Sequence, residues 1–152
     1  MATVGAHAAI RMNVSLANVE SFSKQLTDFT SIVLPYNDFK AQDEWVYHIF
    51  FLGRVYSLGY ECISNLEAGL GRFDIMMKSC EFNAVIEFKV ASSATNKALQ
   101  AEVEKAVKQI DTKEYWHELR KSPLPTYKIG IACHGKKCLA KAVLHEFSGA
   151  TT

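Results

Sequence analysis

The sequence lacks the short motifs that mark several large classes of enzymes and nucleotide-binding proteins. Neither GxGxxG nor GxxxxGK[ST], the glycine-rich loops that hold phosphates, occurs in the 152 residues, so nucleotide binding is not supported. The nucleophile motif GxSxG and the zinc motif HExxH are missing as well.

Long apolar runs are also missing, because no stretch reaches the length needed to span a membrane. The N-terminus has no charged region followed by an apolar stretch, so no signal peptide is expected. We therefore expect an intracellular, cytoplasmic protein that makes no membrane contact, or a nuclear one if it acts as an effector.

Cysteine pairs and excess charge are sparse. The four cysteines, Cys62, Cys80, Cys133 and Cys138, contain no CxxC pair, so free thiols are expected rather than a zinc site. The chain has 17 basic and 16 acidic side chains and a net charge of +1. This balance neither marks a nucleic-acid-binding protein nor excludes one, because a basic patch beside an acidic metal site sums to about zero.

The composition that remains is that of a folded domain, with 49% hydrophobic and 22% charged residues. Residues 1–14 are expected to be loose and residues 15–148 to form a single domain. Apolar periodicity predicts an α/β protein whose mixed sheet contains a helical crossover. The expected helices cover 15–34, 38–58, 95–121 and 139–147, and the expected strands cover 60–65, 73–78, 84–90 and 127–133.

Charged residues on the third predicted strand suggest a function. Side chains alternate along a strand, so Glu87 and Lys89 share one face while Ile86 and Phe88 point to the other. Charge within an apolar strand is costly unless it is paired or binds an ion. Asp74 lies on the preceding strand, and antiparallel pairing would bring it beside Glu87.

Two carboxylates held close together repel each other unless a cation bridges them. Such oxygen ligands favour Mg²⁺ or Mn²⁺. Lys89 would then orient or help deprotonate the attacking water. In the alternative interpretation, Glu87 and Lys89 form a solvated pair on an exposed strand face, and Asp74 is a turn residue.

A set of short segments, in fixed order and spacing, extends this pattern over roughly residues 15–140. The segments are Ser31-Ile32 with Pro35-Tyr36, Glu44 with Tyr47-His48, Asn65-Leu66-Glu67, Gly71-Arg72-Phe73-Asp74-Ile75, Ile86-Glu87-Phe88-Lys89, Ala106 with Gln109-Ile110, Lys113 with Tyr115, and Gly130-Ile131-Ala132 with Gly135-Lys136-Lys137. Together they resemble the PD-(D/E)XK nuclease superfamily, and within it the bacterial family whose nuclease domain often follows a predicted AAA-ATPase domain.

This resemblance implies a restriction-endonuclease-like α-β-β-β-α-β core, in which helices flank a mixed central sheet, with an extra N-terminal helix. Two departures from the family pattern stand out. Phe73 occupies the place of the signature's proline, a position that varies in the superfamily. The 152 residues contain no ATPase domain, so they are expected to be either an excised domain or a stand-alone form, and any ATP-coupled role is in doubt.

The resemblance also adds Glu44 as an acidic site residue, which would hold a water at the metal or a second ion. His48 lies four positions further along the same helical face and is a candidate too. The backbone carbonyl of Phe88 is expected as a third oxygen ligand. The alternative for Glu44 and His48 is an ordinary pair on a helix surface.

Gln109 matches the glutamine that related nucleases place on the helix after the Glu-x-Lys strand, where its amide bonds a water at the metal or a DNA phosphate. Tyr115 is a further candidate, with helix packing as the alternative. Arg72, expected on the strand face opposite Asp74, would contact phosphate or form a structural ion pair. Several lysines could contact DNA or form a solvated face: Lys105, Lys108, Lys113, Lys136, Lys137 and Lys141.

The resemblance therefore implies a deoxyribonuclease that uses Mg²⁺ or Mn²⁺ to hydrolyse DNA phosphodiester bonds. Its catalytic residues would be Asp74, Glu87, Lys89, Glu44 and Gln109. DNA is the expected partner, together with a second copy of the chain or an ATPase domain or partner as in related proteins. The alternatives are an enzyme acting on RNA or a nucleotide, and a catalytically inactive nuclease-fold module that binds nucleic acid or a protein.

Overall fold

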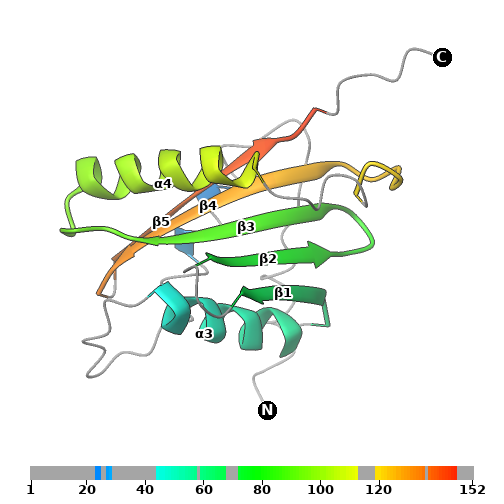
Figure 1. Cartoon of the computed structure of the whole chain (residues 1–152), viewed down its shortest axis with the longest axis horizontal. Coiled ribbons are helices and arrows are strands. Elements are labelled where there is room, and N and C mark those ends of the chain that lie inside the picture. The colour runs from blue at the N-terminus through cyan, green and yellow to red at the C-terminus, as the bar shows by residue number, and fades with distance from the viewer. Residues whose placement is uncertain are drawn as a thin grey trace.

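The computed structural model describes residues 23–24, 27–28, 44–57, 59–67, 72–112, 119–135 and 137–146. Two helices and five strands follow one another in this part of the chain (Figure 1). They are α3 (Glu44–Ser57), β1 (Glu61–Glu67), β2 (Arg72–Lys78), β3 (Asn83–Val90), α4 (Asn96–Ile110), β4 (Thr126–His134) and β5 (Lys137–Leu144). Residues 23–24 and 27–28 are helical, and the rest of the expected helix over 15–34, like the expected loose segment 1–14, lies outside the described residues.

The strands form one mixed sheet in the order β1-β2-β3-β4-β5. The pairs β1–β2, β2–β3 and β4–β5 are antiparallel, whereas β3 and β4 are parallel. Parallel neighbours need a crossover connection, and α4 provides it. The predicted α/β class, mixed sheet and α-β-β-β-α-β order are therefore confirmed.

Helices α3 and α4 cover opposite faces of the sheet (Figure 1). Successive strand residues point to opposite faces, so the neighbours Val85 and Ile86 of β3 identify the two sides. Ile86 packs in a core cluster with Phe51 of α3, and Val85 packs in another cluster with Ile110 of α4. Since both residues are fully buried, β3 is a central strand that is covered on both sides.

Helix α4 begins at a well-formed cap and ends earlier than the sequence predicts. The Thr95 hydroxyl accepts a hydrogen bond from the Ala98 N–H at 3.2 Å, as an N-cap residue should. The predicted helix over 95–121 is not continuous, because α4 ends at Ile110 and a turn follows at 111–112. Residues 113–118 of the prediction lie outside the described residues, and Leu119 is helical. There the Thr112 hydroxyl donates to the Gln109 carbonyl at 2.7 Å and closes the last turn.

The prediction of a closing helix over 139–147 was wrong, because residues Lys137–Leu144 form strand β5. Alanine, leucine and lysine favour helix in isolation. Along β5, however, every second residue is buried, which is the period of a strand. Gly135, with a φ of 57°, sits in the tight turn that folds β5 back onto β4. Pairing with β4 therefore overrides the local helix preference.

No helix among the described residues is long and apolar enough to cross a membrane.

Candidate functional site

The backbone brings Asp74 and Glu87 directly opposite each other. In the antiparallel pairing of β2 with β3, the register runs from Lys78 opposite Asn83 to Asp74 opposite Glu87. Opposed residues of an antiparallel pair lie on the same face of the sheet, about 4.5–5.5 Å apart at Cβ. The expected juxtaposition of these two positions is therefore present, although the Asp74 side chain lies outside the described part of the structure.

The paired register of β2 and β3 ends at this same point. Both strands continue past it, β2 back to Arg72 and β3 on to Val90, but the last pair in register is Asp74 with Glu87. Phe88, whose carbonyl is an expected metal ligand, follows immediately after. Beyond Asp74 and Glu87, β2 and β3 no longer pair with each other, and we call this point the fork.

Glu87 is completely buried at this fork. Its side chain is 0% exposed, the Lys89 side chain is 17% exposed, and Lys89 Nζ lies 3.7 Å from Glu87 Oε1. This distance exceeds the about 2.7–2.9 Å of a charge-assisted hydrogen bond, so the two groups form an ion pair without a tight hydrogen bond. The alternative of a solvated pair on an open strand face does not hold, because α4 covers this face.

A close approach of α4 to β4 seals the face that carries Glu87. Gly130 pairs with Glu87 across β3–β4, and a Cβ atom at Gly130 would lie 2.7 Å from the Val103 carbonyl oxygen and 3.2 Å from the Ala106 Cβ. A side chain at Gly130 would push the helix away from the sheet. Gly130 belongs to one of the segments that carry the family resemblance, and an isolated glycine within a strand often marks such a close approach.

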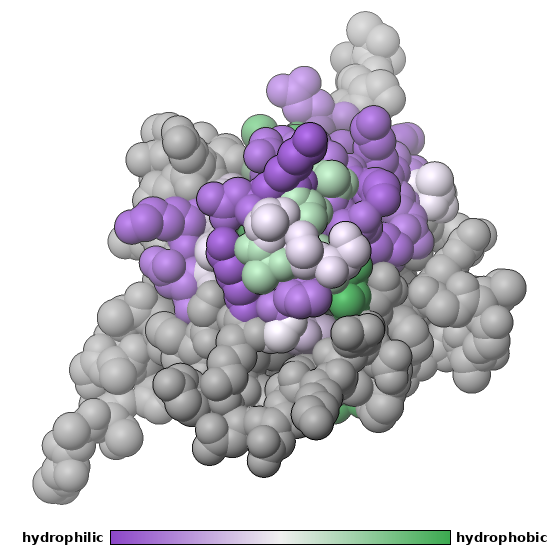
Figure 2. All heavy atoms as spheres, turned by 90° about the vertical axis from the view of Figure 1, so that its left-hand side faces the viewer, coloured by the Kyte–Doolittle hydropathy of each residue, from purple (hydrophilic) through white to green (hydrophobic). Residues whose placement is uncertain are grey.

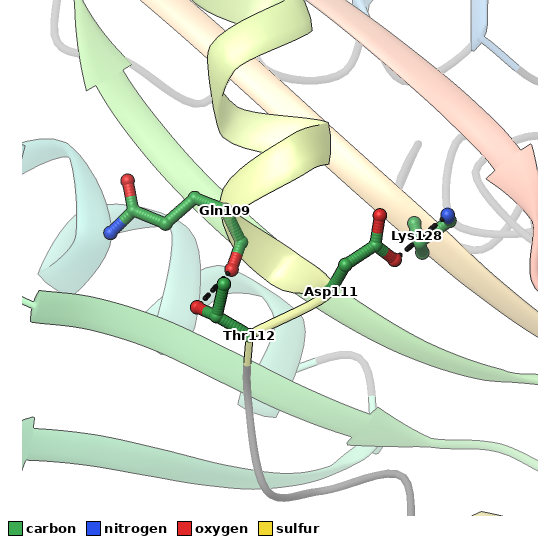
Figure 3. A network of polar contacts seen from close by, with 4 residues as sticks. All are labelled: Gln109, Asp111, Thr112 and Lys128. Atoms are coloured by element: carbon green, nitrogen blue, oxygen red, sulfur yellow. Dashed lines mark hydrogen bonds and ion pairs between the residues drawn. The ribbon is translucent and has the colours of Figure 1, made fainter.

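Gln109 lies in the last turn of α4, near the same face. Its neighbour Ile110 packs against Val85, which precedes Glu87 by two residues, or about 7 Å of strand. Figure 3 shows the Gln109 side chain extending away from the ion pair in which Lys128 Nζ donates to Asp111 Oδ1 at 3.0 Å. Gln109 is half-buried and is not tied into that pair.

Helix α3 contributes from the other face. His48 is fully buried, and its ring centroid lies 6.0 Å from that of Phe88, on the side of β3 opposite Glu87. The Tyr47 hydroxyl donates to the Gly135 carbonyl at 3.0 Å, which fixes the start of α3 at the end of the sheet where β3 and β4 finish. Glu44, the first residue of α3, is therefore at the same end of the sheet as Lys89, with its side chain outside the described part.

For two further candidates, Arg72 and Tyr115, the structure corrects the first and does not describe the second. Arg72 was expected opposite Asp74, but residues two apart on a strand share a face, so both positions of β2 lie on the same side. The Arg72 side chain and the whole of Tyr115 lie outside the described residues.

The described side chains alone contain no group of three or more His, Cys, Asp or Glu residues that could hold a metal ion. Two of the three expected carboxylates, Asp74 and Glu44, are not among those side chains. The metal site thus stays a prediction that the backbone register makes geometrically feasible.

Several lysines proposed for DNA contact are engaged in contacts within the protein. Lys105 and Lys141 form ion pairs of 2.6 Å with Glu102 and Glu104, respectively. Lys137 donates to the Asn96 side chain at 3.0 Å. These contacts fit the solvated-face interpretation for the lysines concerned. Lys113 and Lys136 lie outside the described residues.

Burial shifts the pKa of groups around the site's end of the sheet. Burial, with the Cys133 and Cys138 thiols nearby, raises the pKa of Tyr47 to about 12, so this hydroxyl remains a hydrogen-bond donor at neutral pH. Its bond to Gly135 therefore persists over the physiological range.

Comparison with known protein families gives a match over most of the chain. A family model described as the PD-(D/E)XK nuclease superfamily matches residues 42–143, which include α3, all of β1–β4, α4 and nearly all of β5. No curated protein and no solved structure matches the chain.

Proposed function

This chain belongs to the PD-(D/E)XK nuclease superfamily, and we propose that it is a metal-dependent nuclease that hydrolyses phosphodiester bonds of DNA. One observation supports this proposal above the others. A fully buried Glu87 carboxylate, with the Lys89 ammonium 3.7 Å away, lies opposite Asp74 where β2 and β3 part. Burying a carboxylate is costly unless a nearby charge or a bound ion compensates it, so this burial supports a role in binding a cation.

The residues at the fork fit a hard divalent cation. Carboxylate and carbonyl oxygens are the ligands that Mg²⁺ and Mn²⁺ prefer, and Asp74, Glu87 and the Phe88 carbonyl would supply them. Glu44 would add a further oxygen from the start of α3. When bound, such a cation supplies positive charge beside the scissile phosphate and makes water a stronger nucleophile at neutral pH.

Lys89 would act directly on the reacting groups. Its ammonium is partly exposed while its neighbour Glu87 is buried, so it lies between the interior and the surface at which DNA would dock. In this position Lys89 would hold the attacking water and offset the charge that grows on the phosphate oxygens. The Gln109 amide would donate to a phosphate oxygen or hold the same water.

A plasmid-cleavage assay tests this first prediction. The full chain is incubated with supercoiled DNA and Mg²⁺ or Mn²⁺, and we expect cleavage that EDTA abolishes. Glu87→Gln and Lys89→Ala should each lower the rate by at least about 100-fold, the lower range for loss of one general acid–base or charge-stabilising group. Glu81→Gln and Lys121→Ala are matched controls at exposed positions and should cut like the parent.

Other outcomes separate the competing functions. If Glu87→Gln and Lys89→Ala cut as fast as the parent, the assigned site is wrong. If the parent binds DNA in a gel-shift assay but never cleaves it with either metal, the chain is a binding module. A parallel assay with RNA of the same sequence distinguishes the two substrates.

A further inference from the structure

The hairpin of β4 and β5 holds two cysteines directly opposite each other. Cys133 near the end of β4 pairs in register with Cys138 near the start of β5. Both are free thiols, both are buried, and both belong to the same core cluster. Free thiols were predicted at both positions from the absence of a CxxC pair, and a helix over 139–147 was predicted where most of β5 lies.

The type of strand pairing at this position suits a disulfide. The N–H groups of Ala140 and Ala142 donate away from β4, to the hydroxyls of Thr27 and Ser23 at 2.9 Å each. Ala140 and Ala142 are thus not hydrogen-bonded to β4 through their backbone. Cys138 lies two residues before Ala140, so it also occupies a non-hydrogen-bonded position. Residues opposed in this way have Cα atoms about 4.5 Å apart, within the range of about 4.4–6.8 Å found for disulfides.

We propose that Cys133 and Cys138 form a modification site, a dithiol that a small disulfide such as oxidised glutathione converts into a cross-strand disulfide. The Cys138 thiolate, the less buried of the two, attacks one sulfur of oxidised glutathione and releases one glutathione thiolate. The Cys133 thiolate then attacks the Cys138 sulfur of the mixed disulfide and releases the second. The cysteines lose two protons and two electrons, and the glutathione disulfide is reduced to two thiols.

Hydrogen bonds connect this hairpin to the segment after β3 and to helix α3. The Ala91 N–H donates to the Cys133 carbonyl at 2.9 Å, and the Tyr47 hydroxyl binds the turn at Gly135. Figure 2 views the molecule from the end where α4 begins and where β4 joins β5, and largely hydrophilic side chains surround a small area of near-neutral and weakly hydrophobic ones there. The thiols are thus buried below a water-facing turn, and burial raises the pKa of Cys133 well above its usual value. Oxidation of the folded protein should consequently be slow, taking hours.

The test uses the full chain under native conditions, with oxidised or reduced glutathione, followed by alkylation in denaturant and peptide mass mapping. We expect oxidised glutathione to produce a Cys133–Cys138 cross-link that lacks two hydrogens, and to raise the melting temperature of the protein. Reduced glutathione should reverse both changes.

The double variant Cys62→Ala/Cys80→Ala removes the other two thiols and should form the same cross-link. Cys138→Ala should form none. A cross-link that appears only after denaturation, one that involves Cys62 or Cys80, or stable glutathione adducts in place of the cross-link would each overturn the proposal. Peptide mapping of the parent protein decides the question by itself, so the test remains valid even if Cys138→Ala fails to fold.

Discussion

At the scale of single residues, Glu87 stands out because its carboxylate is fully buried. A carboxylate with no exposed surface must be compensated by nearby charge, and the Lys89 ammonium at 3.7 Å supplies part of that compensation. A bound cation would supply more. Stability and metal binding should therefore be linked through this one side chain.

The linkage gives a prediction that does not depend on catalysis. Mn²⁺ at about 100 times its dissociation constant should stabilise the parent by about 2.7 kcal/mol. Glu87→Gln should remove most of that gain, because it removes a ligand, whereas Glu81→Gln should retain it. Thermal melts with and without Mn²⁺ measure the difference, and equal stabilisation of parent and Glu87→Gln would show that Glu87 binds no metal.

At the scale of elements, the crossover helix α4 determines which groups on its face of the sheet reach solvent. Its contact with the sheet depends on Gly130, where an added Cβ would come within 2.7 Å of the Val103 carbonyl oxygen. A backbone atom cannot rotate out of the way as a flexible side chain can. The helix as a whole would have to shift.

Gly130→Ala should therefore destabilise the protein by about 1–3 kcal/mol, as expected for overpacking at a tight contact. Gly53→Ala is the matched control, because Gly53 lies exposed in the interior of α3 with no atom within 4 Å of the added Cβ. That control should leave stability unchanged or raise it by up to about 1 kcal/mol. Urea denaturation compares the two, and an equal effect would argue against the close contact.

Local patterns predicted most of these elements. The run of β-branched and aromatic residues around Glu87, and the apolar stripe of α4 from Leu99 to Ile110, are signals that need no knowledge of distant partners. β5 was missed because its alanines and lysines favour helix, and only its pairing with β4 makes it a strand. The end of α4 was missed because a turn hydroxyl, that of Thr112, closes it.

The candidate site was predictable in part for the same reason. Strand period alone places Glu87 and Lys89 on one face, and the register confirms Asp74 opposite Glu87. That this face is covered depends on the packing of α4 over Gly130, which is a tertiary contact. The burial of Glu87 could therefore not be derived from the strand pattern.

At the scale of the whole molecule, stability should depend on pH through His145, which follows β5. Burial lowers the pKa of His145 below its usual value of about 6.5, and the nearby Lys128 lowers it further. The unfolded chain then binds a proton more readily than the folded one. The stability associated with neutral His145 is present above pH of about 6.5 and is lost as the pH falls through and below that value.

The parent should accordingly lose more stability than His145→Gln between pH 7 and pH 5, because glutamine does not titrate. Urea denaturation of both proteins at the two pH values measures this difference. A parallel loss in parent and variant would mean that other groups, and not His145, account for the acid sensitivity.

The two hydroxyls on the outer side of β5 have a consequence for assembly. Thr27 and Ser23 occupy the outward N–H groups of Ala140 and Ala142, and Thr27 also donates to the Ala140 carbonyl at 3.4 Å. An unpaired edge strand can form backbone hydrogen bonds with another chain and extend the sheet, which often leads to aggregation. Along this part of β5 the outward N–H groups already have partners, so a second chain cannot pair with them. Two copies that meet on one DNA duplex would have to join through a different surface.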